Sequence, residues 1–293
     1  MRRQATKWEA TAALVFAAAI FGTTFITVKG AIANVPVVSF LAMRFLVGSA
    51  AMMPFTHKRP RTPGLLRAGG LAGIVLLLSY LAQTEGLRFT DEATSAFITY
   101  LLVIFVPLIV AVLTRRLPTF WTALGVIVAA VGLFLLSGAT TAGLSRGEVL
   151  TLLCAVGFAS HIVILDRVAS RHDAVLLNAV QLGVVGLGCL IPGFFTPGGY
   201  HFPVSAWLAV IYLGVMASAA AFFLQTWAQT RIEPARAALL LMLEPVFAAV
   251  LNATLGRGLP ARGLLGGSCI LIGIVVVELA AWRRRGFDLR GAH

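Results

Sequence analysis

Long apolar runs alternate with short polar breaks over almost the whole chain of 293 residues. The breaks carry turn-forming or charged residues, as in "HKRPRTPG", "RRLP" and "TPGGYHFP". Each run has about 20 residues, enough for a helix to cross roughly 30 Å of hydrocarbon. The pattern predicts ten membrane-spanning helices, over residues 10–30, 36–56, 67–87, 92–114, 119–138, 147–167, 174–195, 205–229, 235–256 and 262–282.

Composition and charge agree with a multi-pass membrane protein. Hydrophobic residues make up 59% of the chain and charged residues only 12%, so the expected fold class is all-α integral membrane. Placing both termini in the cytoplasm puts 17 of the 23 basic residues on that side, 5 on the other and Arg44 inside the membrane. The positive-inside rule therefore predicts an orientation with both termini cytoplasmic and accounts for the net charge of +12, and no nucleic-acid binding is expected.

The two halves of the chain resemble each other. Displaced by 137 residues, "IFGTTFITVK" meets "GFASHIVILD", with Phe21 on Phe158; displaced by 142, "QTEGLRFTDEA" meets "QTWAQTRIEPA" and residues 115–118 meet 257–260 as Arg-x-Leu-Pro. Five spans per half is an odd number, so the second half is expected to be inverted, as in many secondary transporters. The predicted units are residues 1–145 and 146–293 within one membrane domain. The alternative to transport is that the duplication only builds a stable helical bundle.

Two charged side chains lie deep inside predicted spans. Glu244, followed by Pro245 in "LLLMLEPVFAAVL", lies about ten residues or roughly 15 Å into its span. An acid there costs at least ~2.5 kcal/mol, so it needs a partner or water, and Pro245 predicts a kink. We interpret Arg44, Glu244 and Pro245 as gating or structural polar residues and favour a pair between Arg44 and Glu244. A cation or proton site at Glu244, and a substrate carboxylate on Arg44, are the alternatives.

Aromatic and uncharged polar residues recur at helical spacing in several spans. The candidate substrate-binding residues are Tyr80, Gln83, Thr84, Phe97, Tyr100, His161, Phe222 and Gln225. Ordinary aromatic packing and a merely hydrogen-bonded histidine would give the same pattern. If the residues form a cavity, it suits a zwitterion or neutral amphipathic solute better than a phosphate ester, which would need several buried Lys or Arg side chains.

Together these features resemble the drug/metabolite transporter superfamily, in its ten-helix EamA-type branch. The resemblance rests on Arg44 in "AMRFLVG", on "LEPVFAAVL", on "GLRFTDEA" and on two five-helix halves, and covers about residues 8 to 282. It implies an inner-membrane carrier, often an exporter of amino acids or other small metabolites, that works by alternating access. The first half departs from the symmetric pattern, because Val106 and not a glutamate precedes Pro107.

The expected function is export of small metabolites, with neutral or aromatic amino acids first. The alternative is a flippase or carrier of lipid-linked or nucleotide sugars, and a non-transport scaffold comes after it. The chain has no HExxH, GxSxG or phosphate-binding GxxxxGKS, so no enzyme is expected. Cys154, Cys189 and Cys269 lack paired spacing and are interpreted as small hydrophobic residues, neither metal ligands nor a disulfide framework. No metal and no cofactor are expected. The expected partners are a small-molecule substrate and the lipid bilayer, in a monomer or weak dimer. Proton exchange through Glu244 or His161 and uniport without a coupling ion are alternatives for the mechanism.

Overall fold

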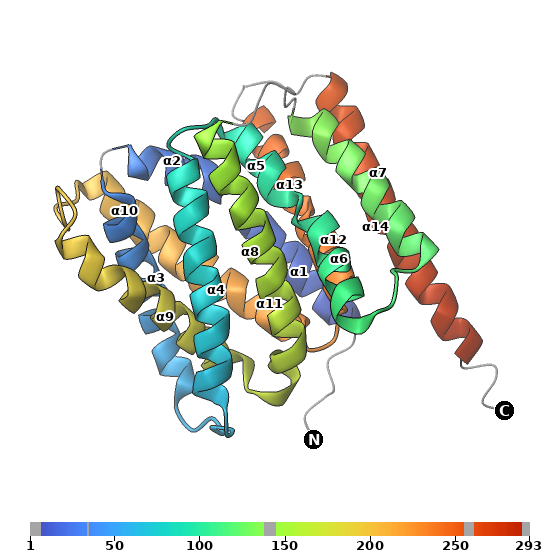
Figure 1. The fold of residues 1–293 in the computed structure, drawn as a ribbon, viewed down its shortest axis with the longest axis horizontal. Coiled ribbons are helices and arrows are strands. Elements are labelled where there is room, and N and C mark those ends of the chain that lie inside the picture. The colour runs from blue at the N-terminus through green and yellow to red at the C-terminus, as the bar shows by residue number, and fades with distance from the viewer. Residues whose placement is uncertain (1–6, 34, 138–144, 255–260, 289–293) are drawn as a thin grey trace.

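The described chain is a bundle of helices. The computed structural model describes residues 7–33, 35–137, 145–254 and 261–288, and these contain no β-strand (Figure 1). The first half contains α1 (Lys7–Phe21), α2 (Thr24–Ile32), α3 (Val37–Thr56), α4 (Leu65–Gly86), α5 (Glu92–Tyr100), α6 (Leu102–Thr114) and α7 (Phe120–Ser137). The second half contains α8 (Arg146–Val168), the 3₁₀-helix η1 (Ala169–Arg171), α9 (Ala174–Phe194), α10 (Val204–Tyr212), the π-helix η2 (Leu213–Ala221), α11 (Phe222–Ala228), α12 (Pro234–Leu241), α13 (Leu243–Asn252) and α14 (Ala261–Asp288).

The predicted all-α membrane fold is confirmed. Within the described ranges, nine helical segments are long and apolar enough to cross a membrane, and α7, apolar over Phe120–Leu136, is a shorter tenth. The first helix begins and the last helix ends at the same end of the bundle, as an even number of crossings requires (Figure 1). The second Arg-x-Leu-Pro piece of the predicted repeat, at 257–260, lies outside the described residues, as do both chain termini.

Polar side chains at the breaks fix where several helices begin. Ser145 and Glu148 form a reciprocal capping box at the start of α8. Asp91 accepts a hydrogen bond from a backbone N–H in the first turn of α5, and Asp173 does the same for α9. Pro234 opens α12, where the missing N–H costs nothing. The polar breaks therefore supply the start signals that an apolar run cannot supply itself.

Small residues let the helices approach closely, which is how membrane helices gain packing energy without a hydrophobic driving force. The end of α4 crosses the start of α8 at Gly86 and Gly147, where a β-carbon on either residue would lie 2.8 Å from the carbonyl oxygen of the other. Gly73 similarly brings α4 against Val184 of α9. These contacts join the two halves of the chain directly.

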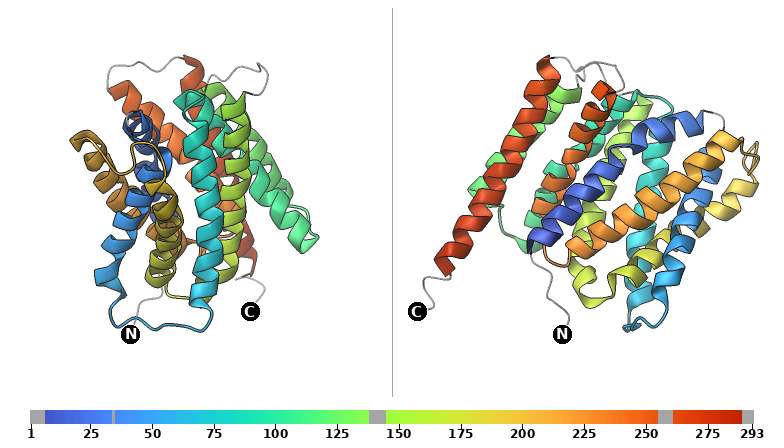
Figure 2. Two further views of the ribbon diagram at one scale, coloured as in Figure 1. Left: turned by 60° about the vertical axis from the view of Figure 1, so that its left-hand side comes forward. Right: turned by 180° about the vertical axis from the view of Figure 1, so that it is seen from behind.

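The two helices α7 and α14 form a pair at one edge of the bundle (Figures 1 and 2). Their backbones meet at two glycine crossings, Gly125 with Gly273 and Gly132 with Gly266. A β-carbon on Gly266 would lie 2.4 Å from the Leu136 nitrogen and 2.5 Å from the Gly132 oxygen. Both are backbone atoms, which cannot turn aside as a flexible side chain could.

Replacing Gly266 by alanine is therefore expected to destabilise the α7–α14 pair, by about 1–3 kcal/mol as for other overpacked sites. Gly267 is the matched control, because a β-carbon there meets nothing within 4 Å. Alanine favours the helix equally at both positions, so the difference in melting temperature between the two variants isolates the clash. Equal melting temperatures would contradict the glycine crossing.

Candidate functional site

Four spans are not continuous α-helices within the described ranges. The first span is interrupted between α1 and α2 at Gly22 and Thr23, the fourth at Leu101, and the ninth at Met242, while the eighth passes through the π-helix η2. Such π segments are rare and often lie at functional sites. In the sequence, all four irregularities fall near the middle of their spans, where a broken helix needs protein or water to satisfy its backbone.

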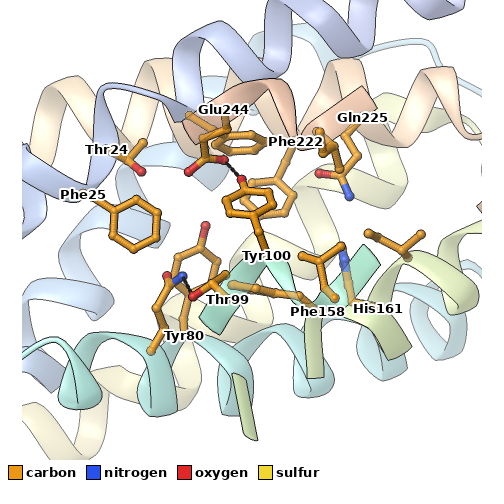
Figure 3. A pocket seen from close by; sticks show the side chains of 15 residues that line it. Thr24, Phe25, Tyr80, Thr99, Tyr100, Phe158, His161, Phe222, Gln225 and Glu244 are labelled. Atoms are coloured by element: carbon orange, nitrogen blue, oxygen red, sulfur yellow. Dashed lines mark hydrogen bonds between the residues drawn. The ribbon is translucent and has the colours of Figure 1, made fainter. Parts of the chain in front are cut away.

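A cavity lies among these interrupted spans (Figure 3). It has about 540 Å³ of empty space, its opening included. Its lining residues come from both halves of the chain and are Phe21, Thr24, Phe25, Tyr80, Gln83, Thr99, Tyr100, Leu102, Phe158, His161, Ile162, Phe222, Gln225, Leu241 and Glu244. The lining is thus aromatic and aliphatic, with a small number of polar groups, as is usual for a small-molecule site.

The lining is built almost entirely of residue pairs related by the internal repeat. With the displacement of 137 residues the pairs are Phe21 with Phe158, Thr24 with His161, and Phe25 with Ile162; with 142 they are Tyr80 with Phe222, Gln83 with Gln225, Thr99 with Leu241, and Leu102 with Glu244. Only Tyr100 has its mate, Met242, outside the lining. Equivalent positions of the two halves therefore face one common space.

Glu244 is the acidic residue of this lining. It lies in the first turn of α13, just after the interruption at Met242, where the helix dipole favours an anion. The Tyr100 hydroxyl, from the end of α5, donates a hydrogen bond to Glu244 Oε2 (Figure 3). Both side chains are buried. This contact links the two halves at the interruptions of the fourth and ninth spans, and the repeat mate of Glu244 is the uncharged Leu102.

The expected pair between Arg44 and Glu244 is not formed, which corrects the sequence-based interpretation. Arg44 is only 1% exposed, does not line the cavity, and donates from Nε to Ser218 Oγ of the π-helix at 3.2 Å. Its guanidinium carbon lies 4.9 Å from the centre of the Tyr80 ring. Ser218 and Tyr80 therefore make the contacts with Arg44 that a carboxylate would otherwise make. Arg44 packs behind Tyr80, which lines the cavity.

Two predicted binding residues lie away from the cavity. Thr84 is buried on α4 but is not among the lining residues, although Tyr80 and Gln83 are. Phe97 packs edge-on against Phe134 of α7, with ring centres 5.9 Å apart. Helical spacing alone therefore selected more residues of these helices than the cavity contacts. The other predicted binding residues, Tyr80, Gln83, Tyr100, His161, Phe222 and Gln225, all line it.

His161 is held by a buried polar network. Its Nε2 lies 2.9 Å from Gln181 Oε1, and Gln181 Nε2 donates to Asn178 Oδ1 at 2.8 Å and to Thr226 Oγ1 at 3.3 Å. Asn178 Nδ2 donates in turn to the carbonyl oxygen of Ala219 in the π-helix, at 3.0 Å. Sequence reasoning did not select Asn178 or Thr226. The signal was present, because Asn178 and Gln181 are polar residues three apart in an otherwise apolar helix.

Gln225, a lining residue, is hydrogen-bonded to a second glutamine that does not belong to the lining. Gln225 Nε2 donates to Gln229 Oε1 at 3.3 Å, and Gln229 Nε2 donates to the Ile162 carbonyl oxygen at 2.8 Å. The repeat mate of Gln225 makes a different contact, because Gln83 Nε2 donates to Thr99 Oγ1 at 3.3 Å. Gln83 is half-buried while Gln225 is only 4% exposed. Equivalent residues of the two halves thus have different environments in this conformation.

Comparison with known proteins identifies the family. The EamA-like transporter family matches the chain twice, over residues 8–138 and 145–279. An uncharacterized transporter of Archaeoglobus fulgidus is 27% identical over 91% of this chain and 84% of its own length, and the uncharacterized transporter YcxC of Bacillus subtilis is 25% identical over 87% and 88%. A solved crystal structure shares the fold with a TM-score of 0.78, at 22% identity over 95% of this chain and 99% of that one. The chain belongs to the EamA-like transporter family.

Proposed function

We propose that this transporter exports small amphipathic metabolites across the inner membrane by alternating access, and that neutral or aromatic amino acids are the solutes to test first. The observation that carries the proposal is the cavity whose lining consists of repeat-related residue pairs. A solute site between two related halves is the arrangement expected of a carrier. In this proposal residues 1–145 and 146–293 are the two halves, and the helix ends at Lys7 and Asp288 face the cytoplasm.

The differences between the halves support movement of one half relative to the other. The first span is broken at Gly22 and the eighth contains a π-helix, whereas their repeat mates α8 and α4 are continuous. If the halves exchange these local conformations, access to the cavity changes from one side of the membrane to the other. Protons are the proposed coupling ion, with Glu244 as the group that would carry them.

The chemistry of the lining limits the solute. Aromatic rings and amides suit an amphipathic molecule of amino-acid size. No lysine or arginine belongs to the lining, although a nucleotide sugar would require such groups for its phosphates. A small solute with few anionic groups is therefore favoured.

A flippase for a lipid-linked solute is the second candidate, and one observation favours it. A groove of about 850 Å³, open space included, runs between α2 and α10 and is lined by side chains such as Ile26, Leu208 and Tyr212. Thr23 and Tyr212 join the two helices by a hydroxyl hydrogen bond of 2.7 Å. Thr23 also precedes the cavity residue Thr24, so in this second candidate the bond between Thr23 and Tyr212 separates when a lipid-linked solute enters from the side.

Solute counterflow in proteoliposomes tests the proposal. The purified chain is expected to exchange one or more members of a panel of neutral and aromatic amino acids. If no amino acid exchanges while a lipid-linked or nucleotide sugar does, the amino-acid assignment is wrong.

Replacing Gln83 by leucine is expected to lower this counterflow about tenfold, because it removes a polar group from the cavity wall while keeping the side-chain volume. Thr84→Val is the matched control, since Thr84 is the buried neighbour that does not line the cavity. Folded yield is measured beside transport. Unchanged counterflow at normal yield would remove Gln83 from the site.

A further inference from the structure

Several donor groups of the cavity wall are already engaged by the protein. The Tyr100 hydroxyl proton goes to Glu244, and each lining glutamine uses its amide nitrogen on a protein oxygen, Gln83 on Thr99 and Gln225 on Gln229. Each amide keeps a second hydrogen, and the hydroxyls of Thr24, Tyr80 and Thr99 can donate or accept, while Glu244 Oε1 and the two glutamine carbonyl oxygens only accept. The carboxylic acid of the wall is therefore an acceptor, and no lysine or arginine of the wall opposes it.

The buried network adds one more acceptor at His161. A carbonyl oxygen can only accept a hydrogen bond, so the Ala219 carbonyl must face the amide nitrogen of Asn178 and not its oxygen. Asn178 Oδ1 then faces Gln181 and must accept from the amide nitrogen of Gln181. Gln181 Oε1 consequently faces His161 Nε2, which must carry the hydrogen. A neutral imidazole with its proton on Nε2 has a lone pair on Nδ1. Three amide or carbonyl groups thus set the tautomer of this cavity residue.

The buried arginine behind Tyr80 does not offer a hydrogen-bond donor to the cavity. Arg44 is buried behind Tyr80 and bonded to Ser218, and it does not belong to the lining. Four phenyl rings complete the wall, from Phe21, Phe25, Phe158 and Phe222, whereas Arg44 already lies over the Tyr80 ring. The faces of such rings attract cations, and they attract them more strongly where water is excluded.

We propose that the cavity recognises an ammonium group, so that its preferred ligand is a primary amine on an aromatic or branched apolar body. An ammonium has three donors and no acceptor, which complements Glu244, His161 Nδ1 and the glutamine oxygens. A carboxylate on the same molecule meets no cation in the wall and adds no affinity. The inference rests on the proposed function only in taking this cavity as the solute site.

Three ligands that share a phenyl ring separate the two ends of an amino acid. The purified full chain in detergent is titrated with 2-phenylethylamine, phenylalanine and 3-phenylpropionate, and binding is measured by calorimetry. The amine is expected to bind at least tenfold more tightly than the propionate and no more weakly than phenylalanine. A propionate that binds as tightly as the amine, or an amine that binds tenfold more weakly than phenylalanine, overturns the inference.

Two conservative variants test the acceptors. Glu244→Gln keeps an oxygen for the Tyr100 hydroxyl but removes the negative charge, and is expected to weaken amine binding at least tenfold. His161→Gln keeps a nitrogen donor for Gln181 but removes the imidazole lone pair, and is expected to weaken it about threefold. Melting temperature reports whether each variant is folded.

Glu85→Gln is the matched control, because it makes the same charge change at a glutamate that pairs with Arg88 outside the lining. Its amine affinity is expected to equal that of the unmodified chain. If Glu244→Gln is folded and binds the amine normally, the inference is wrong.

Counterflow separates this inference from the proposed function. Amine binding without exchange of any solute would keep the ammonium site and overturn the proposed transport activity. Exchange of phenylalanine by a chain that does not bind the amine would do the reverse.

Discussion

Valine in place of Gly22 is expected to reduce transport at least tenfold and to lower the melting temperature. Gly22 lies at the interruption between α1 and α2, directly against α13. A β-carbon there would lie 2.9 Å from Phe247 Cβ, 3.0 Å from the Glu244 carbonyl oxygen and 3.1 Å from the Ala248 nitrogen. Two of these are backbone atoms, so α13 itself must move, at a cost of about 1–3 kcal/mol. That movement displaces Glu244 from Tyr100 and from the cavity.

The matched control is valine at Gly30, in the other half of the same span. A β-carbon at Gly30 meets nothing within 4 Å, so the change in helix propensity is tested without the clash. Counterflow per folded molecule and melting temperature are measured for both variants. A second variant that combines Gly22→Val with Phe247→Gly, which removes the Phe247 β-carbon, should recover only part of the activity, because the two backbone contacts remain. Normal transport by Gly22→Val would show that α13 is not held in place by this contact.

The helices could be predicted from the sequence because apolar runs of sufficient length determine them locally. The interruptions and the π-helix within the spans have both local and long-range causes. Pro245 lacks the N–H that would bond the Leu241 carbonyl, and α12 ends at Leu241, as the predicted kink requires. Pro107 would free the carbonyl of Val103, yet the fourth span breaks earlier, at Leu101. The π-helix has no comparable local signal. It packs against α3, where a β-carbon on Gly48 would lie 2.9 Å from both the Gly214 oxygen and Ser218 Cβ.

The candidate site could be predicted where the repeat and helical spacing agreed. Tyr80 and Gln83 pair with Phe222 and Gln225 at one displacement, and all four line the cavity. Phe97 shares the spacing but faces α7, because the packing of that helix is set by contacts distant in sequence. The partners of Arg44 were equally hidden, since Ser218 reaches it only through the π-helix. Spacing therefore identifies candidate faces, and tertiary contacts decide which of them become a site.

Replacing Arg44 by methionine is expected to abolish most transport, at least tenfold, while changing the melting temperature by only a few degrees. Arg44 is a buried charge, and within the described chain no carboxylate lies within ion-pair distance of it. Its desolvation is unfavourable, so removing the charge returns part of the free energy that is lost with the Ser218 bond. The Tyr80 ring, however, loses a desolvated cation–π contact of about 2 kcal/mol and is no longer held toward the cavity.

A loss of transport without a comparable loss of melting temperature distinguishes a residue that positions Tyr80 from one that only stabilises the fold. Arg44→Lys keeps the charge but cannot both bond Ser218 and lie flat over Tyr80, so intermediate transport is expected. Arg231→Met is the matched control, because Arg231 lies 4.8 Å from the centre of the Trp227 ring, outside the cavity, and its loss should leave transport unchanged. A folded Arg44→Met protein that transports normally would mean that Tyr80 keeps its orientation unaided. The contacts of the Tyr80 ring with Phe45, Phe158 and Phe222 would then suffice to shape the wall.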